Sequence, residues 1–190
     1  MIKAVIFDCF GVLAREGFFP FLEEYFAPDS NDKQEAIDTM RRMGAGLLGH
    51  DECIAELARL ANISYAEMET KLTDNPADEK LFAYIETDLK PHYKVAMLSN
   101  AGADRTIELF GERRAALFDD VVLSYQVGMT KPDPEIYTLA VTRLGIMPEE
   151  AVFIDDVERY CNAAEQIGMR ALWHQDSAET IARLKELLSA

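Results

Sequence analysis

The chain has 190 residues, of which 49% are hydrophobic and 28% charged, a composition typical of a folded globular protein rather than a disordered, collagenous or disulfide-rich chain. Its 19 basic and 34 acidic residues give a net charge of -15, which disfavours nucleic acid and anionic membranes as partners. An anionic substrate would have to be attracted by a local device such as a metal ion, a lysine or a helix N-terminus.

The first apolar run is interrupted by Asp8, and no other segment approaches a membrane span, so we expect neither a signal peptide nor a transmembrane helix. The histidines share no motif and no ligand spacing, and we interpret them as surface residues: His50, His92 and His174. The cysteines are too few and too scattered for a disulfide framework or a thiolate metal site, which favours the reducing cytoplasm: Cys9, Cys53 and Cys161.

Short apolar runs bounded by turn-forming or acidic residues predict five buried, parallel strands. In chain order these are Ile2–Phe7, Val95–Ser99, Val121–Ser124, Ala151–Ile154 and Arg170–Trp173. Segments with helical spacing lie between the later strands, and two of them end at Gly145 and Gly168. This alternation predicts an α/β layered core whose strands are joined by right-handed crossovers.

Between residues 14 and 90 the alternation is broken, because this stretch has helix signals and no convincing strand. Ser64 and Glu67 form a capping box, and Pro76 suits the first turn of a helix. An apolar stripe marks one helix and glycines mark a loop before it: Ile54, Leu57, Ala58 and Ala61, and Gly44, Gly46 and Gly49. We therefore expect a core of residues 1–13 and 91–190 with an inserted helical cap at 14–90.

Polar side chains stand at the ends of three predicted strands. Asp8 follows the first strand, Ser99 and Asn100 end the second, and the pair Asp155 and Asp156 follows the fourth. Because ligands bind beyond the carboxyl ends of parallel strands, we expect these groups to converge at one edge of the sheet. Taken alone, Asp8 could be a nucleophile, a metal ligand or a turn-former.

Two adjacent acids near Asp8 would raise one another's pKa values unless a cation neutralised them, and Mg²⁺ is the simplest such cation. The alternative is that Asp155 and Asp156 cap the next helix. Lys131 precedes a proline-rich turn at the mouth of a predicted helix, where its ammonium could balance Asp8. An ordinary surface lysine remains the alternative.

In this order the motifs resemble those of the haloacid dehalogenase superfamily. The matching segments are Asp8, Ser99–Asn100, Lys131–Tyr137 and Phe153–Asp156, followed by Ala163–Ala164 and Gly168–Met169, and they span nearly the whole chain. The chain is similar to members with a helical C1 cap (subfamily I), among them sugar-phosphate phosphatases and the N-terminal domains of epoxide hydrolases. The resemblance implies a Rossmann-like core with sheet order 5-4-1-2-3 and a helical cap inserted between the first two motifs.

The resemblance also implies roles for individual residues. Asp8 would attack the substrate and form a covalent intermediate, Ser99 and Asn100 would hold the substrate anion, and Lys131 would stabilise charge. The implied cofactor is Mg²⁺, held by side chains and, at one position, by a backbone carbonyl: Asp8, Phe10, Asp155 and Asp156.

Phe10 departs from the family pattern. Most phosphatases of the family carry a second aspartate there, which protonates the leaving oxygen and then activates water, and Phe10 can do neither. Such general acid-base help is worth about 10²- to 10⁴-fold in rate. We therefore predict a Mg²⁺-dependent hydrolase, a phosphatase of a small phosphorylated metabolite whose leaving group departs without protonation, such as an anomeric sugar, acyl or aryl phosphate.

Two alternative functions remain open. A 2-haloacid dehalogenase would suit an aromatic residue at Phe10, although the retained pair Asp155 and Asp156 argues against it. A binding or regulatory protein that keeps the fold without turnover would suit Phe10 together with Val157 and Tyr160, where relatives have small or polar residues. The sequence is compatible with a monomer or a homodimer.

Arginines of the cap could reach a substrate anion, although solvated arginines are more common: Arg15, Arg41 and Arg42.

Overall fold

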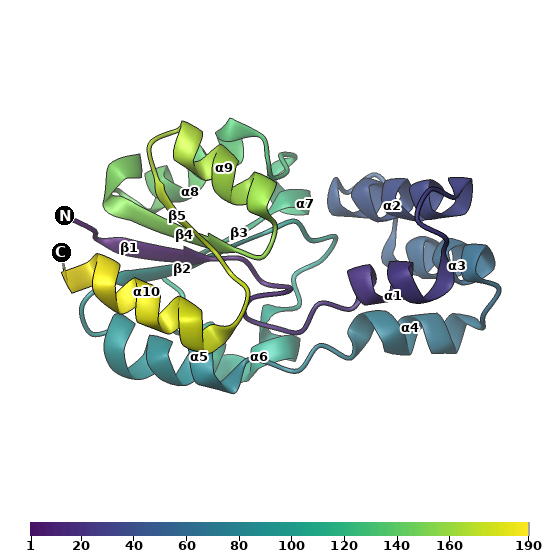
Figure 1. Cartoon of the computed structure of the whole chain (residues 1–190), viewed down its shortest axis with the longest axis horizontal. Helices are drawn as coiled ribbons and strands as arrows, with labels where there is room; N and C mark the ends of the chain where they lie inside the picture. Colours follow the sequence, from purple (N-terminus) through teal and green to yellow (C-terminus); the bar gives the residue numbers. More distant parts are fainter. Residues whose placement is uncertain (190) are drawn as a thin grey trace.

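The structure is a computed structural model that describes residues 1–189, and its centre is a five-stranded parallel sheet (Figure 1). The strands follow the order β3-β2-β1-β4-β5, which confirms the expected sheet and its order. Each strand lies within two residues of its predicted position. Their bounds are β1 (Ala4–Phe7), β2 (Lys94–Ser99), β3 (Asp120–Leu123), β4 (Ala151–Asp155) and β5 (Arg170–Trp173).

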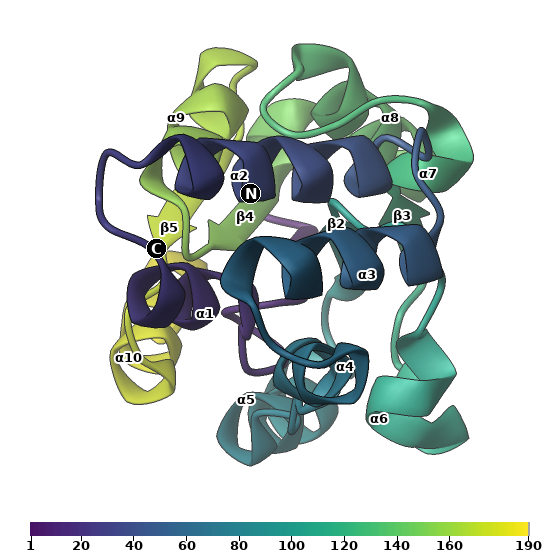
Figure 2. The same cartoon turned by 90° about the vertical axis from the view of Figure 1, so that its right-hand side faces the viewer.

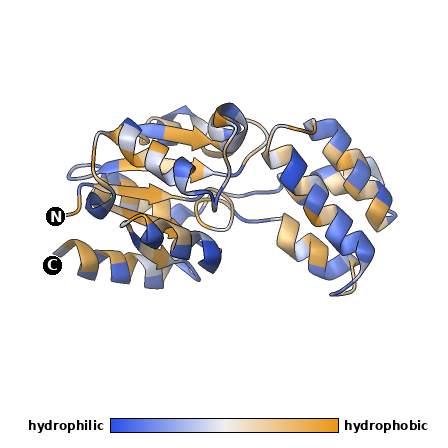
Figure 3. Ribbon diagram, turned by 90° about the horizontal axis from the view of Figure 1, so that it is seen from above, coloured by the Kyte–Doolittle hydropathy of each residue, from blue (hydrophilic) through white to orange (hydrophobic). Residues whose placement is uncertain are grey.

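Helices cover both faces of this sheet, with α5, α6 and α10 on one side and α8 and α9 on the other (Figure 1). The alternation along β1 explains the two layers, because Val5 and Phe7 belong to one hydrophobic cluster and Ala4 and Ile6 to the other. A sheet buried on both faces accounts for the apolar strands of the sequence, which Figure 3 shows in orange. The helical elements of the core are α5 (Glu79–Tyr84), the π-helical turn η1 (Ile85–Leu89), α6 (Thr106–Ala115), α7 (Ser124–Val127), α8 (Pro134–Leu144), η2 (Pro148–Glu150), α9 (Glu158–Gln166) and, after the last strand, α10 (Ser177–Ser189).

Four further helices stand beyond the carboxyl ends of the strands (Figures 1 and 2). They share a separate hydrophobic cluster, in which the predicted apolar stripe contributes Ile54 and Leu57, both fully buried. The Ser64 side chain accepts a hydrogen bond from the Glu67 backbone N–H, as its position before a helix predicts. The helices are α1 (Phe18–Tyr25), α2 (Asn31–Gly44), α3 (His50–Ala61) and α4 (Tyr65–Thr73). We refer to residues 18–73 as the cap helices; their division from the core as a domain stays a prediction.

Residues 79–89 lie in the core layer, whereas we expected the insertion to continue to residue 90. Leu81, Ile85 and Leu89 are fully buried in the cluster that contains Phe7. Pro76 precedes this helix instead of opening it, because the Asp78 carboxylate accepts a hydrogen bond from Leu81 N and so starts α5 at Glu79. Helical spacing alone could not distinguish a helix that packs on the sheet from one that packs in the cap.

The cap helices are docked on the core through a buried serine. The Ser124 hydroxyl, which is fully buried at the start of α7, donates to the Gly44 carbonyl at the end of α2. The same hydroxyl accepts a hydrogen bond from Ala101 N at 3.0 Å, in the loop after β2. At Gly102 a Cβ would lie 2.7 Å from Met43 Cγ, so the cap approaches this loop closely. The loop that follows Ser99 is therefore in contact with the cap.

The buried residues include one histidine, so the interpretation of all three histidines as surface residues is wrong. His174 is 8% exposed, its Nδ1 lies 2.9 Å from the Thr180 hydroxyl, and burial lowers the pKa of the ring. The three cysteines are free and buried. Among the described helices, none has the length and apolar character needed to span a membrane.

Candidate active site

Three carboxylates meet at the carboxyl edge of the sheet. Asp8 follows β1, Asp155 ends β4 and Asp156 comes next, and the ligand oxygens of the three lie within 4.8 Å of one another. Asp8 is 7% exposed and Asp155 fully buried, while Asp156 is partly exposed. The neighbouring pairing of β1 with β4 brings these residues together, as the positions at the strand ends predict.

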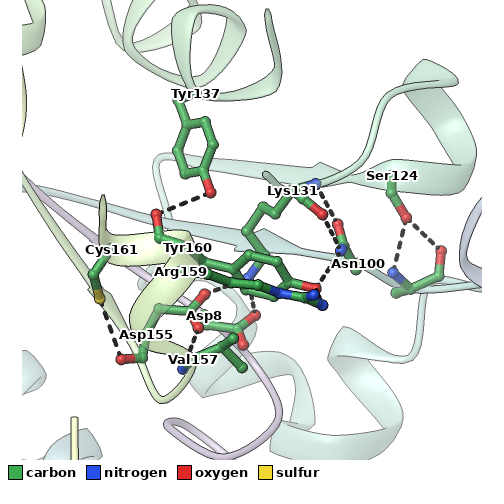
Figure 4. A network of polar contacts seen from close by, with 11 residues as sticks. Asp8, Asn100, Ser124, Lys131, Tyr137, Asp155, Val157, Arg159, Tyr160 and Cys161 are labelled. Atoms are coloured by element: carbon green, nitrogen blue, oxygen red, sulfur yellow. Dashed lines mark hydrogen bonds and ion pairs between the residues drawn. The ribbon is translucent and has the colours of Figure 1, made fainter. Parts of the chain in front are cut away.

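Lys131 lies beneath this group, with its side chain only 1% exposed. Its Nζ is 2.7 Å from Asp8 Oδ1 and 2.6 Å from Asp155 Oδ2 (Figure 4). Burial alone would lower the pKa of the ammonium, but Asp155 and Asp8 raise it above its ordinary value. The lysine is therefore a permanent cation, and the expectation that Lys131 stands beside Asp8 agrees with the geometry.

One ammonium does not balance three carboxylates. Burial raises the pKa of Asp8 to about 8, with Lys131 acting in the opposite direction and the other two acids adding to the rise. Burial and Asp155 raise the pKa of Asp156 to about 6. A divalent cation with oxygen ligands would compensate this excess of negative charge, so the donor set fits Mg²⁺.

A glycine allows the loop after β1 to reach Asp156. Gly11 has φ +89°, and a Cβ there would lie 2.2 Å from Asp156 Oδ2, so only glycine permits this approach. Phe10 is half-buried and packs against the hydrophobic cluster that contains Phe7. The Trp173 indole donates to the Asp156 carbonyl at 2.8 Å, which holds the turn after β4 from the other side. The close approach of Gly11 and the hydrogen bond from Trp173 thus together position Asp156 directly after the end of β4.

Asp155 uses both of its carboxylate oxygens inside the protein. Oδ2 accepts from Lys131 Nζ, and Oδ1 accepts from the Val157 N–H at 2.8 Å (Figure 4). These bonds fix the lysine under Asp8 and shape the turn into α9. Asp155 was expected among the metal ligands, and in this arrangement its two bonds favour a role in orienting Lys131, with Asp8 and Asp156 more free to hold an ion.

Asn100 is tied to the backbone of Lys131. Its Oδ1 accepts from Lys131 N at 2.8 Å and its Nδ2 donates to Lys131 O at 3.0 Å. The remaining amide hydrogen points toward the Tyr160 hydroxyl, at the longer distance of 3.5 Å. Ser99, 1% exposed, ends β2 directly before it. The structure thus places Asn100 beside Lys131, with Ser99 directly before it at the end of β2.

Tyr160 and Arg159, from the start of α9, also lie near Lys131 and Asn100. From the sequence, Arg159 was assigned no role. The Tyr160 ring centroid is 5.1 Å from Lys131 Nζ, and the Arg159 guanidinium lies 4.9 Å from the same ring. Of the cap arginines, Arg15 forms an ion pair with Asp74 and Arg41 with Asp38. The only signal for Arg159 was its position four residues after the Asp155 that ends β4.

A family model of haloacid dehalogenase-like hydrolases matches residues 2–168. The chain is 25% identical to the D-ribitol-5-phosphate phosphatase of Bacteroides thetaiotaomicron, with 100% of both chains covered. It is 28% identical to the phosphorylated carbohydrates phosphatase of Thermotoga maritima, with 90% of this chain and 84% of that protein covered.

Solved structures show the same architecture. A predicted HAD-like family hydrolase from Porphyromonas gingivalis superposes with a TM-score of 0.76 at 25% identity, over 100% of this chain and 99% of that one. A HAD family enzyme from Bacteroides thetaiotaomicron, solved in complex with magnesium and inorganic phosphate, has a TM-score of 0.69 at 24% identity, over 95% and 99% of the two chains. At that lower identity the likeness concerns the fold alone. Because the family model covers most of the chain, this protein belongs to the haloacid dehalogenase-like hydrolases.

Proposed function

We propose that this protein is a Mg²⁺-dependent phosphohydrolase in which Asp8 accepts the phosphoryl group of a small phosphorylated metabolite. The observation that carries the proposal is the set of three carboxylates whose ligand oxygens lie within 4.8 Å of one another above a buried lysine. A nucleophile, a cation-binding set and a fixed ammonium at one sheet edge are what phosphoryl transfer requires. The names of the two curated relatives, both phosphatases of carbohydrate phosphates, add support.

In this proposal Asp8 and Asp156, with the Phe10 carbonyl, hold the ion and Asp155 completes the anionic set. A bound Mg²⁺ supplies neutralisation of phosphoryl charge. Lys131, 2.7 Å from Asp8, favours the ionised form of that carboxylate and orients it. An Asp8 oxygen attacks phosphorus while the bond from phosphorus to the leaving oxygen breaks, and water then hydrolyses the aspartyl phosphate to inorganic phosphate.

Ser99 and Asn100 would hold the transferring group from the β2 side, through the serine hydroxyl and the amide. Asn100 bonds to the Lys131 backbone in two places, and Ser99 directly precedes it at the end of β2. Hydrogen-bond donors that are fixed before the substrate arrives stabilise developing charge without reorganisation.

Phe10 restricts the leaving group. Its side chain packs in the hydrophobic cluster and carries no proton to donate, so a poor leaving oxygen would depart unassisted. Substrates whose leaving group needs no proton, such as an anomeric sugar phosphate, an acyl phosphate or an aryl phosphate, avoid this cost. The names of the relatives point to carbohydrate phosphates as a class and do not single out an anomeric one, since D-ribitol 5-phosphate is the phosphate of a primary alcohol.

A substrate panel tests the proposal. Purified protein is assayed with 4-nitrophenyl phosphate, glucose 1-phosphate, acetyl phosphate, glucose 6-phosphate and 2-chloropropionate, with Mg²⁺ and with chelator. We expect Mg²⁺-dependent release of phosphate from the first three and slow turnover of glucose 6-phosphate. Asp8→Asn should be inert, and the exposed Asp29→Asn serves as its matched control.

The same panel separates the alternative functions. Chloride release from 2-chloropropionate that survives chelation would identify a dehalogenase. Faster hydrolysis of glucose 6-phosphate than of the aryl ester would reject the restriction on leaving groups. Binding of phosphate with Mg²⁺ but no turnover of any ester would identify a binding protein. Phe10→Asp should gain activity toward glucose 6-phosphate, by up to the factor of about 10² to 10⁴ that general acid-base catalysis contributes.

A further inference from the structure

An exposed arginine stands at the mouth of the site. The Arg159 side chain is exposed to solvent in the first turn of α9, four residues after Asp155. Figure 4 shows its guanidinium beside the Tyr160 ring, whose hydroxyl lies 3.5 Å from Asn100 Nδ2. The chain carries 34 acidic residues, yet within residues 1–189 no carboxylate forms an ion pair with Arg159. Its positive charge is therefore available to a ligand.

This arginine is held in place before any ligand arrives. Its Cζ lies 4.9 Å from the centroid of the Tyr160 ring, and its Nη2 donates to the Tyr160 hydroxyl at 3.1 Å. A cation over an aromatic face is attracted by the ring, and a side chain fixed in this way loses less entropy when it binds. Arg159 is thus preorganised, unlike a freely moving surface arginine.

The tyrosine that holds it is itself anchored. The Tyr137 hydroxyl donates to the Tyr160 carbonyl at 3.0 Å, and Tyr137 is fully buried. Asn100 Nδ2 lies 3.5 Å from the Tyr160 hydroxyl, and Lys131 Nζ lies 5.1 Å from the ring. Tyr160 therefore lies between Arg159 and the two residues Asn100 and Lys131, which are proposed to act on the transferring phosphoryl group.

The two cations near Tyr160 differ in exposure. Lys131 is buried under Asp8 and is used by two carboxylates, whereas Arg159 faces solvent. A group bound by Arg159 would lie closer to solvent than a phosphoryl group held near Lys131. A guanidinium presents a planar fork of donors that matches a carboxylate or a phosphate.

We propose that Arg159, positioned by Tyr160, is a specificity-determining residue that binds a second anionic group in the leaving portion of the substrate. The inference rests on the proposed phosphohydrolase function and adds to it a preference, expressed in KM, for phosphate esters that carry a further acid group. In a protein of net charge -15, such a local cation also offsets the repulsion that a doubly anionic substrate meets.

Matched aryl phosphates test this proposal. Phenyl phosphate and its 3-carboxy and 4-carboxy derivatives share a leaving group that departs readily and differ in the second anion. We expect at least one carboxy derivative to have the lower KM in the wild type. Arg159→Gln should raise that KM about tenfold, the effect of losing one charged hydrogen bond, with kcat and the KM of phenyl phosphate changed less than twofold.

Two further variants refine the result. Tyr160→Phe keeps the ring and removes the hydroxyl, so it should raise the same KM by a smaller factor. Arg170→Gln is the matched control, because Arg170 is exposed at the N-terminal end of β5, whereas the site lies at the carboxyl ends of the strands. Within the described residues, Arg170 forms no ion pair. Its KM values should equal those of the wild type.

Failure of this proposal is distinguishable from failure of the proposed function. Equal KM values for phenyl phosphate and both carboxy derivatives in the wild type, or equal losses for all three in Arg159→Gln, overturn the role of Arg159 alone. Calorimetric binding of the three esters to Asp8→Asn in the presence of Mg²⁺ gives the same comparison without turnover. If none of the esters binds or reacts, both proposals are rejected.

Discussion

Replacing Lys131 by methionine should destabilise the protein far more than loss of an ordinary ion pair. The ammonium is 1% exposed and lies 2.7 Å from Asp8 and 2.6 Å from Asp155, so its removal leaves two buried carboxylates without their cation. Breaking a buried pair by removing one partner costs about 3 to 5 kcal/mol in unfolding free energy. Methionine nearly conserves the volume of the side chain, so the loss reports on charge rather than on a cavity.

The penalty should also depend on pH. The folded-state pKa of Asp8, about 8, is already above that of an unfolded aspartate, so the protein loses stability as pH rises toward that value. Lys131 lowers this pKa, and without it the pKa lies higher still. Lys131→Met therefore continues to lose stability between pH 7 and pH 9, a range over which Asp8 of the wild type becomes ionised.

Urea unfolding in chelator at pH 7 and pH 9 measures both effects. The matched control is Lys90→Met, because the Lys90–Asp119 pair is also 2.7 Å long but its side chains are 29% and 37% exposed. Such a surface pair is worth about 0 to 1 kcal/mol. If Lys131→Met costs no more than Lys90→Met, or costs the same at both pH values, the electrostatic account of this site is wrong.

Three further predictions follow from single contacts. Gly11→Ala places a methyl group against Asp156 at a φ of +89°, so Mg²⁺ affinity measured by calorimetry should fall at least about tenfold. Ser124→Ala removes the buried hydroxyl that bonds to Gly44, costing about 1 to 3 kcal/mol, and should speed hydrogen exchange at residues 43–49. His174→Gln removes a ring whose pKa is lowered by burial in the folded state. Because the unfolded ring takes up a proton first, wild-type stability in urea should fall relative to the variant as pH drops from 7.5 to 5.

The sequence by itself determined most of the fold. Apolar runs of strand length with helices between them predicted a parallel α/β sheet, and the five strands lie within two residues of those runs. The positions of Asp8, Asn100 and Asp156 after strands were enough to expect them at one edge, because parallel strands end on the same side. Resemblance to the family supplied the sheet order and the residue roles, of which the roles stay predictions.

Only the tertiary structure shows which contacts each of these residues makes. Asp155 and Asp156 are neighbours in sequence, but one is bonded to Lys131 and to the Val157 N–H while the other faces the loop at Gly11. Local patterns report the period of a helix or strand, and they do not report which distant segment packs against it. For the same reason the core position of residues 79–89 could not be inferred from helical spacing.

Phe10 and Arg159 illustrate the difference between what the sequence predicts and what only the folded structure shows. The identity of Phe10 was enough to predict a missing proton donor, since no packing can give a phenyl ring a proton to transfer. The role of Arg159 depends on the Tyr160 ring beside it and on Asn100, which comes from another strand end 59 residues earlier in the chain. Chemical capacity is a property of the residue, whereas a binding site is a property of side chains that folding brings within a few ångströms of one another.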